Sequence, residues 1–298
     1  MNSYIKISES KIREYYERKD ATVRIEDCDE IVIDGKILRK QTKIGEKYIT
    51  IYCNEGGYFG KPTTRPKNLC VLKESYILRE SFDNGDRGGH QKNEKMSDDD
   101  LWEERVYRNL CKIAYWINCC FSSIELNPKA NWKGLCWTEA CSSFKKYFGV
   151  ISINPFPGLA INHNPKKRNT KTDPKELKNW MSCNEVRNRF SNYIAILKPD
   201  IIYSGGVDLS LYSSYPIHLF NWFKSRSLSE LMATEGTLTI MDRTIVDGGF
   251  NNGLSWVRTT DNVLWINGVH PSTPGLSHKK MCEIARTLYE LYLQNSIL

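Results

Sequence analysis

The stretch N-V-L-W-I-N-G-V-H-P-S, residues 262–272, joins an apolar strand pattern to a polar turn. Its apolar part is short and β-rich, which favours a buried strand over a helix. Pro271 cannot continue a strand ladder, because proline lacks a backbone N–H and has a fixed φ. The sequence therefore predicts a strand whose carboxyl end holds His270 on a stiff turn.

Two further runs have the same form. K-Y-I-T-I-Y-C-N-E-G-G-Y-F-G, residues 47–60, leads to Asn54, and Y-F-G-V-I-S-I-N-P-F-P-G, residues 147–158, leads to Asn154. In an open parallel sheet the ligand crevice lies outside the carboxyl ends of the strands. We therefore expect Asn54, Asn154 and His270 to meet at one edge of a parallel sheet and to form a site.

The composition is that of a soluble globular protein. The chain has 298 residues, of which 40% are apolar and 26% charged, and this length suits one large domain or two small ones. No run approaches the roughly 18 apolar residues that a transmembrane helix needs, and the N-terminus has no apolar signal-peptide core. We expect a cytoplasmic protein with no membrane contact and no obligate protein partner.

The ten cysteines are scattered and include no C-x-x-C pair. Such a distribution is typical of reduced thiols in apolar segments. The spacing of Cys136 and Cys141 could provide half of a metal or iron–sulfur site, but no second half has suitable spacing. The sequence therefore predicts neither a metal nor a cofactor.

The net charge of +7 arises from 42 basic and 35 acidic residues. The excess is mild, but its distribution is informative. Lys166, Lys167 and Arg168 form a basic cluster after the N-P-F-P loop, and Lys279 and Lys280 follow the H-P-S loop. Positive charge beside two candidate site loops favours an anionic partner, above all a phosphate backbone.

A helix and a hairpin are predicted before the first of the three runs. Residues 8–19 have the pattern of a short capped helix, and Asp34-Gly35 between two β-like runs is typical of a type I′ hairpin turn. We interpret residues 1–46 as an N-terminal helix-hairpin addition. Residues 83–100 and 162–183 are polar and are expected to be long loops.

Strand and helix patterns alternate through the rest of the chain. A helix is expected from about Trp102 onward, a second over residues 184–197, and an amphipathic helix at the end of the sequence. Residues 199–206 favour a strand closing in a glycine turn, and another strand pair is expected around residues 237–246. This alternation favours a single α/β domain over residues 1–298 with a mostly parallel sheet.

Each candidate side chain has a chemical and an ordinary interpretation. An imidazole at the turn of His270 can stabilise a developing anion or satisfy local backbone groups. The amide of Asn154 can read the edge of a heterocycle on which Phe156 stacks, or it can cap a turn. The glycines after Asn54 allow a backbone to approach a ligand closely, or they form a plain turn.

Taken together and in this order, C-N-E-G-G-Y-F-G, N-P-F-P and H-P-S resemble the motifs of the uracil-DNA glycosylase superfamily. The nearest pattern is that of the single-strand-selective monofunctional branch, which carries G-M-N-P-G-P-F-G, N-x-x-P and H-P-S. The resemblance implies a three-layer α/β/α sandwich. It also implies that Asn54 positions water, that Asn154 reads the base and that His270 stabilises the departing base anion. Leu276 falls where the family places a side chain that wedges into the duplex.

The first motif departs from the family pattern. Glu55 replaces a proline, so the water is handled by Asn54, by Glu55 or by both. Gly56 and Gly57 stand where several members place a bulky residue beside the pyrimidine 5-position, and Phe59 closes the motif at the base pocket. The added room suits a large 5-substituent, as in an antiviral glycosylase of this superfamily that excises glucosylated hydroxymethylcytosine from phage DNA.

The resulting hypothesis is a monofunctional DNA glycosylase that flips a modified pyrimidine out of the stack and releases it by hydrolysis. Its DNA contacts are assigned to the basic cluster at residues 166–168 and to Ser272, Leu276 and Lys279. Three alternatives remain open. They are a nucleic-acid-binding protein that keeps the fold without turnover, a uracil-excising repair enzyme, and an enzyme acting on free nucleotides.

Overall fold

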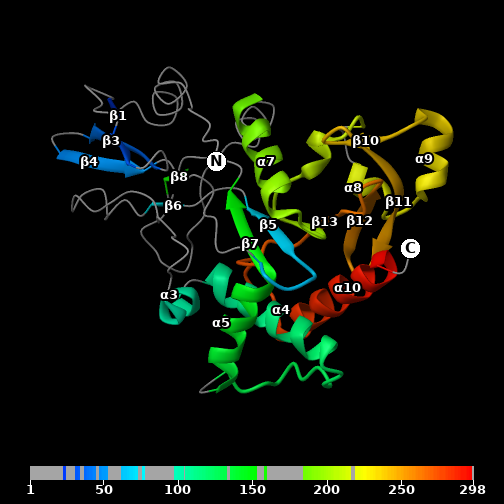
Figure 1. Cartoon of the computed structure of the whole chain (residues 1–298), viewed down its shortest axis with the longest axis horizontal. Coiled ribbons are helices and arrows are strands. Elements are labelled where there is room, and N and C mark those ends of the chain that lie inside the picture. The colour runs from blue at the N-terminus through cyan, green and yellow to red at the C-terminus, as the bar shows by residue number, and fades with distance from the viewer. Residues whose placement is uncertain are drawn as a thin grey trace. The chain divides into compact units, whose positions relative to one another are not determined.

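The computed structural model describes part of the chain in detail. The described residues are 23–24, 31–33, 37–44, 47–52, 62–72, 76–77, 97–103, 105–132, 135–152, 158–159, 184–215 and 219–296. The chain divides into two compact units (Figure 1). Unit 1 comprises Met1–Gly57, Lys73–Lys92 and Ser152–Tyr193, and unit 2 comprises Tyr58–Leu72, Asn93–Ile151 and Ile194–Leu298. The division into two units does not test the prediction that residues 1–298 form a single domain.

Unit 1 contains a small antiparallel sheet and a short strand pair. The sheet consists of β1 (Val23–Arg24), β2 (Ile31–Ile33), β3 (Ile37–Ile44) and β4 (Lys47–Tyr52). The strand pair consists of β6 (Tyr76–Ile77) and β8 (Gly158–Leu159) and is parallel.

The predicted hairpin is present, since β2 and β3 pair antiparallel with Ile33 opposite Ile37. Asp34 and Gly35 themselves lie outside the described residues, as do the predicted helix at residues 8–19 and the predicted loop at residues 162–183. Of the loop predicted at residues 83–100, residues 83–96 lie outside the described residues, and the last three residues, 98–100, are helical because α3 begins at Asp98.

The placement of β4 corrects one expectation. β4 pairs antiparallel with β3, from Ile44 opposite Lys47 to Arg39 opposite Tyr52, and it belongs to the small sheet. The prediction that this strand lies in the same parallel sheet as the strand before His270 is therefore wrong. The physical reason is local: a short connection brings β4 beside its neighbour in sequence, and closing so short a loop costs little chain entropy.

Unit 2 is built around a seven-stranded sheet. Its strands are β5 (Asn68–Leu72), β7 (Phe148–Ser152), β9 (Ile201–Gly205), β10 (Thr239–Ile240), β11 (Arg243–Asn251), β12 (Leu254–Thr259) and β13 (Leu264–Gly268), in the order β10-β11-β12-β13-β9-β5-β7. Its described helices are α3 (Asp98–Glu103), α4 (Arg105–Phe121), α5 (Leu135–Tyr147), α8 (Leu219–Trp222), α9 (Leu228–Glu235) and α10 (His278–Ser296), with a 3₁₀ helix η1 (Leu209–Tyr212). One further described helix, α7 (Asn184–Leu197), has its residues up to Tyr193 in unit 1 and its last residues in unit 2.

The sheet is mixed. β13 pairs parallel with β9, and β9 pairs parallel with β5. The strands from β10 to β13 instead form an antiparallel meander. The predicted α/β class is confirmed. The meander is the part of the sheet that departs from the expected parallel arrangement, and it extends well beyond the single strand pair expected near residues 237–246.

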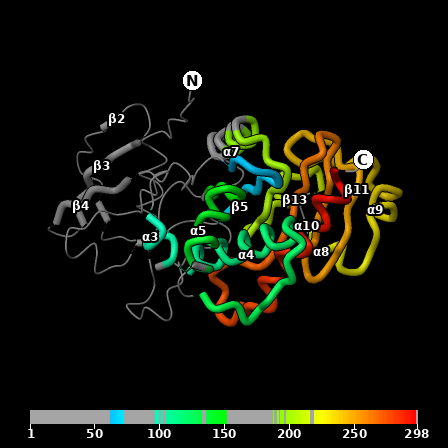
Figure 2. Tube along the Cα trace, turned by 60° about the horizontal axis from the view of Figure 1, so that its bottom comes forward, coloured from blue at the N-terminus to red at the C-terminus, as the bar shows by residue number. Residues whose placement is uncertain are grey.

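Helical elements pack on both faces of this sheet at β11 and β12. A side chain added at Gly248 would meet Phe223, which directly follows α8, whereas one added at Gly249 would meet Trp256. Trp256 packs against the core formed with α4, α5 and α10. Because successive strand residues point to opposite faces, the α8 side and the α4–α10 side are different faces. Figure 2 shows α4 and α10 running beside each other, in agreement with their contacts.

The central strands are consequently buried along their whole length. Every position of β5 and β9 is buried, as expected for strands covered on both faces. Aromatic and aliphatic side chains fill the layer under the long helices, among them Trp116, Phe144 and Phe148, which are at most 1% exposed. This dry layer fixes α4 and α10 against the strands whose carboxyl ends carry the candidate site.

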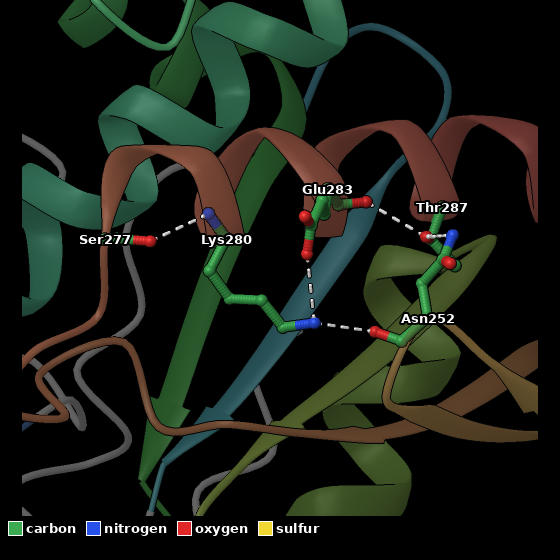
Figure 3. Close-up of polar contacts among 5 residues, drawn as sticks. All are labelled: Asn252, Ser277, Lys280, Glu283 and Thr287. Carbon is green, nitrogen blue, oxygen red and sulfur yellow. Dashed lines mark hydrogen bonds and ion pairs between the residues drawn. The ribbon is translucent and has the colours of Figure 1, made fainter.

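The tip of the β11–β12 hairpin is fastened to α10. Asn252 and Gly253 have φ values of 47° and 82°, so both lie in the left-handed region, as in a type I′ turn. Lys280 Nζ donates to the Asn252 carbonyl oxygen at 2.8 Å, and Asn252 Nδ2 donates to Thr287 Oγ1 at 3.0 Å. Figure 3 shows these contacts together with the ion pair between Lys280 and Glu283 at 3.2 Å.

Candidate functional site

The carboxyl ends of three parallel strands meet at one edge of the seven-stranded sheet. Leu72 of β5 lies opposite Gly205 of β9, and Gly205 lies opposite Gly268 of β13. His270 follows β13 by two residues, so it stands at this edge, where ligands bind in open α/β sheets. The predicted position of His270 at the carboxyl end of a sheet strand is confirmed.

Two glycines at the end of β9 make room for the H-P-S turn. A Cβ at Gly205 would lie 2.7 Å from Cδ of Pro271, closer than any real contact. Gly206 has a φ of 77°, and a Cβ there would lie 3.1 Å from Cδ2 of His270. Gly206 therefore supplies a backbone conformation that favours glycine. Together the two glycines let the turn rest directly on the end of the neighbouring strand.

Ser272 fixes the proton position on His270. The backbone N–H of Ser272 donates to His270 Nδ1 at 3.1 Å, and Ser272 Oγ lies 2.7 Å from the same nitrogen. A backbone amide can only donate, so Nδ1 must accept. In the neutral ring the proton then resides on Nε2. The turn thus holds an imidazole that offers an Nε2–H donor.

Buried side chains hold the backbone carbonyls on both sides of His270. Tyr203 Oη donates to the Val269 carbonyl oxygen at 2.8 Å, and Asn109 Nδ2 donates to the Pro271 carbonyl oxygen at 2.6 Å. Tyr203 is 2% exposed and Asn109 8%. Burial raises the pKa of the Tyr203 hydroxyl above its usual range, so this group remains protonated and remains a donor.

A second polar cluster joins α4 to the start of α10. Lys112, one turn after Asn109, places Nζ 3.0 Å from Nε2 of His278 and within 5.2 Å of the ring centroid of Trp132. Burial, and then the charge of Arg108, lowers the pKa of Lys112 to about 8. The pKa of His278 is lowered by burial and by Lys112.

The other predicted residues after the turn have different environments. Ser272 directs its hydroxyl at His270. Leu276 is half-buried and packs against the hydrophobic core. Lys279 is exposed, whereas Lys280 is bound to Asn252 and Glu283. An exposed Lys279 suits a phosphate contact, but a Leu276 that packs on the core would have to leave it to wedge into a duplex.

Most of the predicted site lies outside the described residues. This holds for the residues of the first two motifs and of the first basic cluster, namely Asn54, Glu55, Gly56, Gly57, Phe59, Asn154, Phe156, Lys166, Lys167 and Arg168. Of the strands before these motifs, β7 belongs to the seven-stranded sheet and β4 does not. The described structure thus places the third motif and the residues around it.

Sequence reasoning missed the two side chains that hold the turn. Asn109 lies on the apolar stripe of α4, between Val106 and Ile113 at helical spacing, and an amide on such a stripe signals a buried polar contact. Tyr203 lies within a strand in which every position is buried, and a buried tyrosine hydroxyl usually has a partner. Both signals were present, but neither identifies its partner.

The comparisons with known proteins add no relative. No protein-family model matches the chain, and no curated protein matches it. Among the described residues, no group of three or more histidine, cysteine or acidic side chains is placed to hold a metal ion. Within the same part of the chain, no helix has the length and apolar character to cross a membrane.

Proposed function

We propose that this chain is a monofunctional DNA glycosylase that hydrolyses the N-glycosidic bond of a flipped-out pyrimidine. The observation that carries the proposal is the H-P-S turn, in which Ser272 makes Nδ1 of His270 an acceptor and so places the proton on Nε2. The turn stands at the carboxyl edge of parallel strands. A preorganised donor at that edge can stabilise negative charge on a departing base.

The proposed reaction assigns one task to each motif. Water attacks C1′ and gives up a proton while the bond between C1′ and the base nitrogen breaks. The electron pair of that bond leaves with the base, which takes up a proton from solvent after release. The Nε2–H of His270 donates to the base anion as it forms. In the proposal Asn54 or Glu55 positions the water, and Asn154 and Phe156 hold the base. These last four assignments rest on the motif resemblance alone.

The finer fold assignment belongs to the same proposal. The motif resemblance implies a three-layer α/β/α sandwich, and the helical elements on both faces of β11 and β12 support it. The proposal of a DNA partner rests on the exposed Lys279, at the start of α10, and on the net charge of +7. Phosphate contacts of this type position the duplex without selecting the base.

The base is proposed to be a pyrimidine with a large 5-substituent, such as a hypermodified cytosine of phage DNA, which would make the role antiviral defence. The reason is the pair Gly56-Gly57, which by the motif resemblance stands where several members of the superfamily have a bulky residue beside the pyrimidine 5-position. A uracil-excising repair enzyme would instead release plain uracil. The two possibilities differ only in the base that is released.

Base release from a panel of DNAs tests the proposal. The panel contains uracil, hydroxymethylcytosine and glucosylated cytosine, and the released base is identified by mass spectrometry. We expect His270→Ala to lower release by about 10²-fold, the typical effect of removing one stabiliser of developing charge. Thr273→Ala is the matched control, because the contact of Thr273 with His270 uses the backbone N–H. Unchanged release by His270→Ala would contradict the proposal, and DNA binding without any release would indicate a non-catalytic binder.

A further inference from the structure

We infer that Asn109 of α4 is a positioning residue that holds His270 in its donor orientation by binding the turn from behind. The inference rests on the proposed function, because it assigns Asn109 a part in presenting the Nε2–H of His270. It starts from the 2.6 Å hydrogen bond between Asn109 Nδ2 and the Pro271 carbonyl oxygen. Its two partners are 162 residues apart in sequence.

The first step is the burial of the bond. Asn109 is 8% exposed and Pro271 is buried, so water does not readily replace the amide as donor. A carbonyl left without a partner in such a place is costly, and the chain would move to satisfy it. The turn therefore depends on Asn109 more than an exposed loop depends on any one contact.

The second step is the geometry of the turn. The Pro271 carbonyl belongs to the peptide unit that also contains the Ser272 N–H, and this N–H is the donor to His270 Nδ1. A peptide unit is planar, so fixing its oxygen also fixes the direction of its N–H. Asn109 thus determines where the Ser272 N–H points, and that N–H determines which ring nitrogen of His270 carries the proton.

The third step is that the other contacts of the turn, among the described residues, do not orient this peptide unit. Tyr203 holds the Val269 carbonyl, two residues before that of Pro271, and the Thr273 N–H binds the His270 carbonyl. These bonds locate the backbone of the turn but do not orient the Pro271–Ser272 peptide. Asn109 is the side chain seen to contact that peptide oxygen among the described residues.

The test combines two variants with a matched control. Asn109→Leu replaces the amide donor by an apolar side chain of similar size. Asn109→Asp keeps the shape of the side chain but places a carboxylate against the Pro271 carbonyl oxygen. Asn118→Leu is the control: Asn118 lies on the same helix, and its amide oxygen accepts from the Tyr147 hydroxyl at 3.2 Å, away from the turn. Melting curves verify that each variant is folded.

The primary readout is the nitrogen NMR spectrum of the His270 ring, which distinguishes the Nε2–H from the Nδ1–H tautomer and does not require activity. We expect a single Nε2–H tautomer in the wild-type protein and in Asn118→Leu, and a mixture of tautomers in both Asn109 variants. An unchanged tautomer in the folded Asn109 variants overturns the inference. In the wild-type protein, rapid solvent exchange of the Asn109 side-chain protons overturns it without any variant.

The second readout is the kinetics of base release. We expect kcat to fall by about 10²-fold in the Asn109 variants, since a small misplacement of a reacting group has effects of this size, while KM for DNA changes little. A tautomer change with unchanged kcat overturns the positioning role. If the wild-type protein releases no base from any DNA, the proposed function fails, and the ring spectra still decide whether Asn109 orients His270.

Discussion

Two loops of the same sheet are held by side chains from other elements, and they differ in where those side chains lie. The H-P-S turn is bound by Asn109 and Tyr203 at 2.6 and 2.8 Å, and the hairpin tip at Asn252 is bound by Lys280 and Thr287 at 2.8 and 3.0 Å. The distances are similar. The environments differ, because both side chains at the H-P-S turn are buried, whereas at the hairpin tip Thr287 is buried but the Lys280 side chain is 35% exposed.

The difference shows that hydrogen-bond length alone does not indicate how strongly a loop is fixed. A buried donor cannot be exchanged for water, so its loss leaves an unsatisfied carbonyl, which costs roughly 1–3 kcal/mol. An exposed lysine is replaced by water at little cost, and exposed ion pairs contribute about 0–1 kcal/mol. The turn that carries His270 is therefore expected to be rigid, and the hairpin tip is expected to tolerate substitution of its partly exposed contact, Lys280.

The largest effect is expected from Gly205→Ala. The added methyl group would lie 2.7 Å from Cδ of Pro271, which is buried, so either the turn or the end of β9 must move. Overpacking of this kind costs about 1–3 kcal/mol, and we expect the upper end of that range in chemical denaturation.

Gly236→Ala provides the control for this substitution. Gly236 has a φ of 77° but nothing within 4 Å of its Cβ position, so it reports backbone strain without a clash. Gly205 has no such φ, so a loss at Gly205 larger than that at Gly236 reflects the contact with the turn. A smaller loss at Gly205 would show that the H-P-S turn is loosely held and would break the comparison.

A pH-dependent effect of on the order of 2 kcal/mol is expected from Lys112→Met. Lys112 joins α4 to His278 just beyond the H-P-S turn, and its pKa is lowered from 10.5 to about 8. Between these two pH values the unfolded chain holds a proton that the folded protein has released. The free energy of unfolding of the wild-type protein therefore rises with pH across this window, and Lys112→Met removes that rise.

Denaturation of both proteins at pH 7.5 and at a pH near 10 measures this difference. Groups that titrate in this window only in the unfolded chain, such as Tyr203 and Cys70, whose pKa values burial raises in the folded protein, are present in both proteins, and their contributions largely cancel. If the stability of both proteins changed with pH in the same way, burial would not lower the pKa of Lys112, and the prediction would fail.

Tyr203→Phe is expected to have an effect of about 1 kcal/mol. The variant keeps the ring but removes the hydroxyl that donates to the Val269 carbonyl oxygen, and the loss of one intramolecular hydrogen bond has this typical size. Gly268 permits this contact, since a Cβ there would lie 2.5 Å from Tyr203 Oη. Thermal unfolding measures the effect, and a melting temperature equal to that of the wild-type protein would show that water reaches the Val269 carbonyl.

The same contrast explains which parts of the fold were predictable. Hairpins depend on residues close in sequence, and the β2–β3 hairpin was predicted from Asp34-Gly35. The Asn252-Gly253 pair carried the same signal for the β11–β12 turn and was overlooked. Strand partners far apart in sequence were not predictable from local patterns. The run at residues 47–52 shows a different limit: its partner β3 lies only two residues before it, yet its composition does not determine which sheet it joins.

The sequence predicted the histidine of the site but not the distant side chain that holds its turn. A histidine between an apolar strand and a proline indicated a functional turn, and its position at the sheet edge is confirmed. The proton position on His270 follows from Ser272, two residues away, but the bond from Asn109 to the turn spans 162 residues. An amphipathic stripe predicts that Asn109 is buried without predicting what it contacts, because the partner is set by the packing of α4 against the sheet edge.

The smallest effect is expected from Lys280→Met. The substitution removes the bond to the Asn252 carbonyl and the ion pair with Glu283, both at the surface. We expect a loss of about 0.5 kcal/mol or less, and a further decrease of this loss in high salt, because exposed charges are screened. Lys279→Met, at the exposed neighbouring position, is the control for the loss of charge alone.

Asn252 makes two contacts at the hairpin tip, one with buried Thr287 and one with partly exposed Lys280, and their effects on stability can be compared. Its φ of 47° suits asparagine, and its side chain donates to Thr287 Oγ1. Thr287→Val removes that acceptor, and Thr287 is fully buried. If burial governs how strongly a loop is held, Thr287→Val must lower the free energy of unfolding more than Lys280→Met does, although both side chains contact the same turn. The opposite order would mean that surface charge holds the hairpin tip. The contrast with the H-P-S turn would then reflect the kind of contact and not its burial.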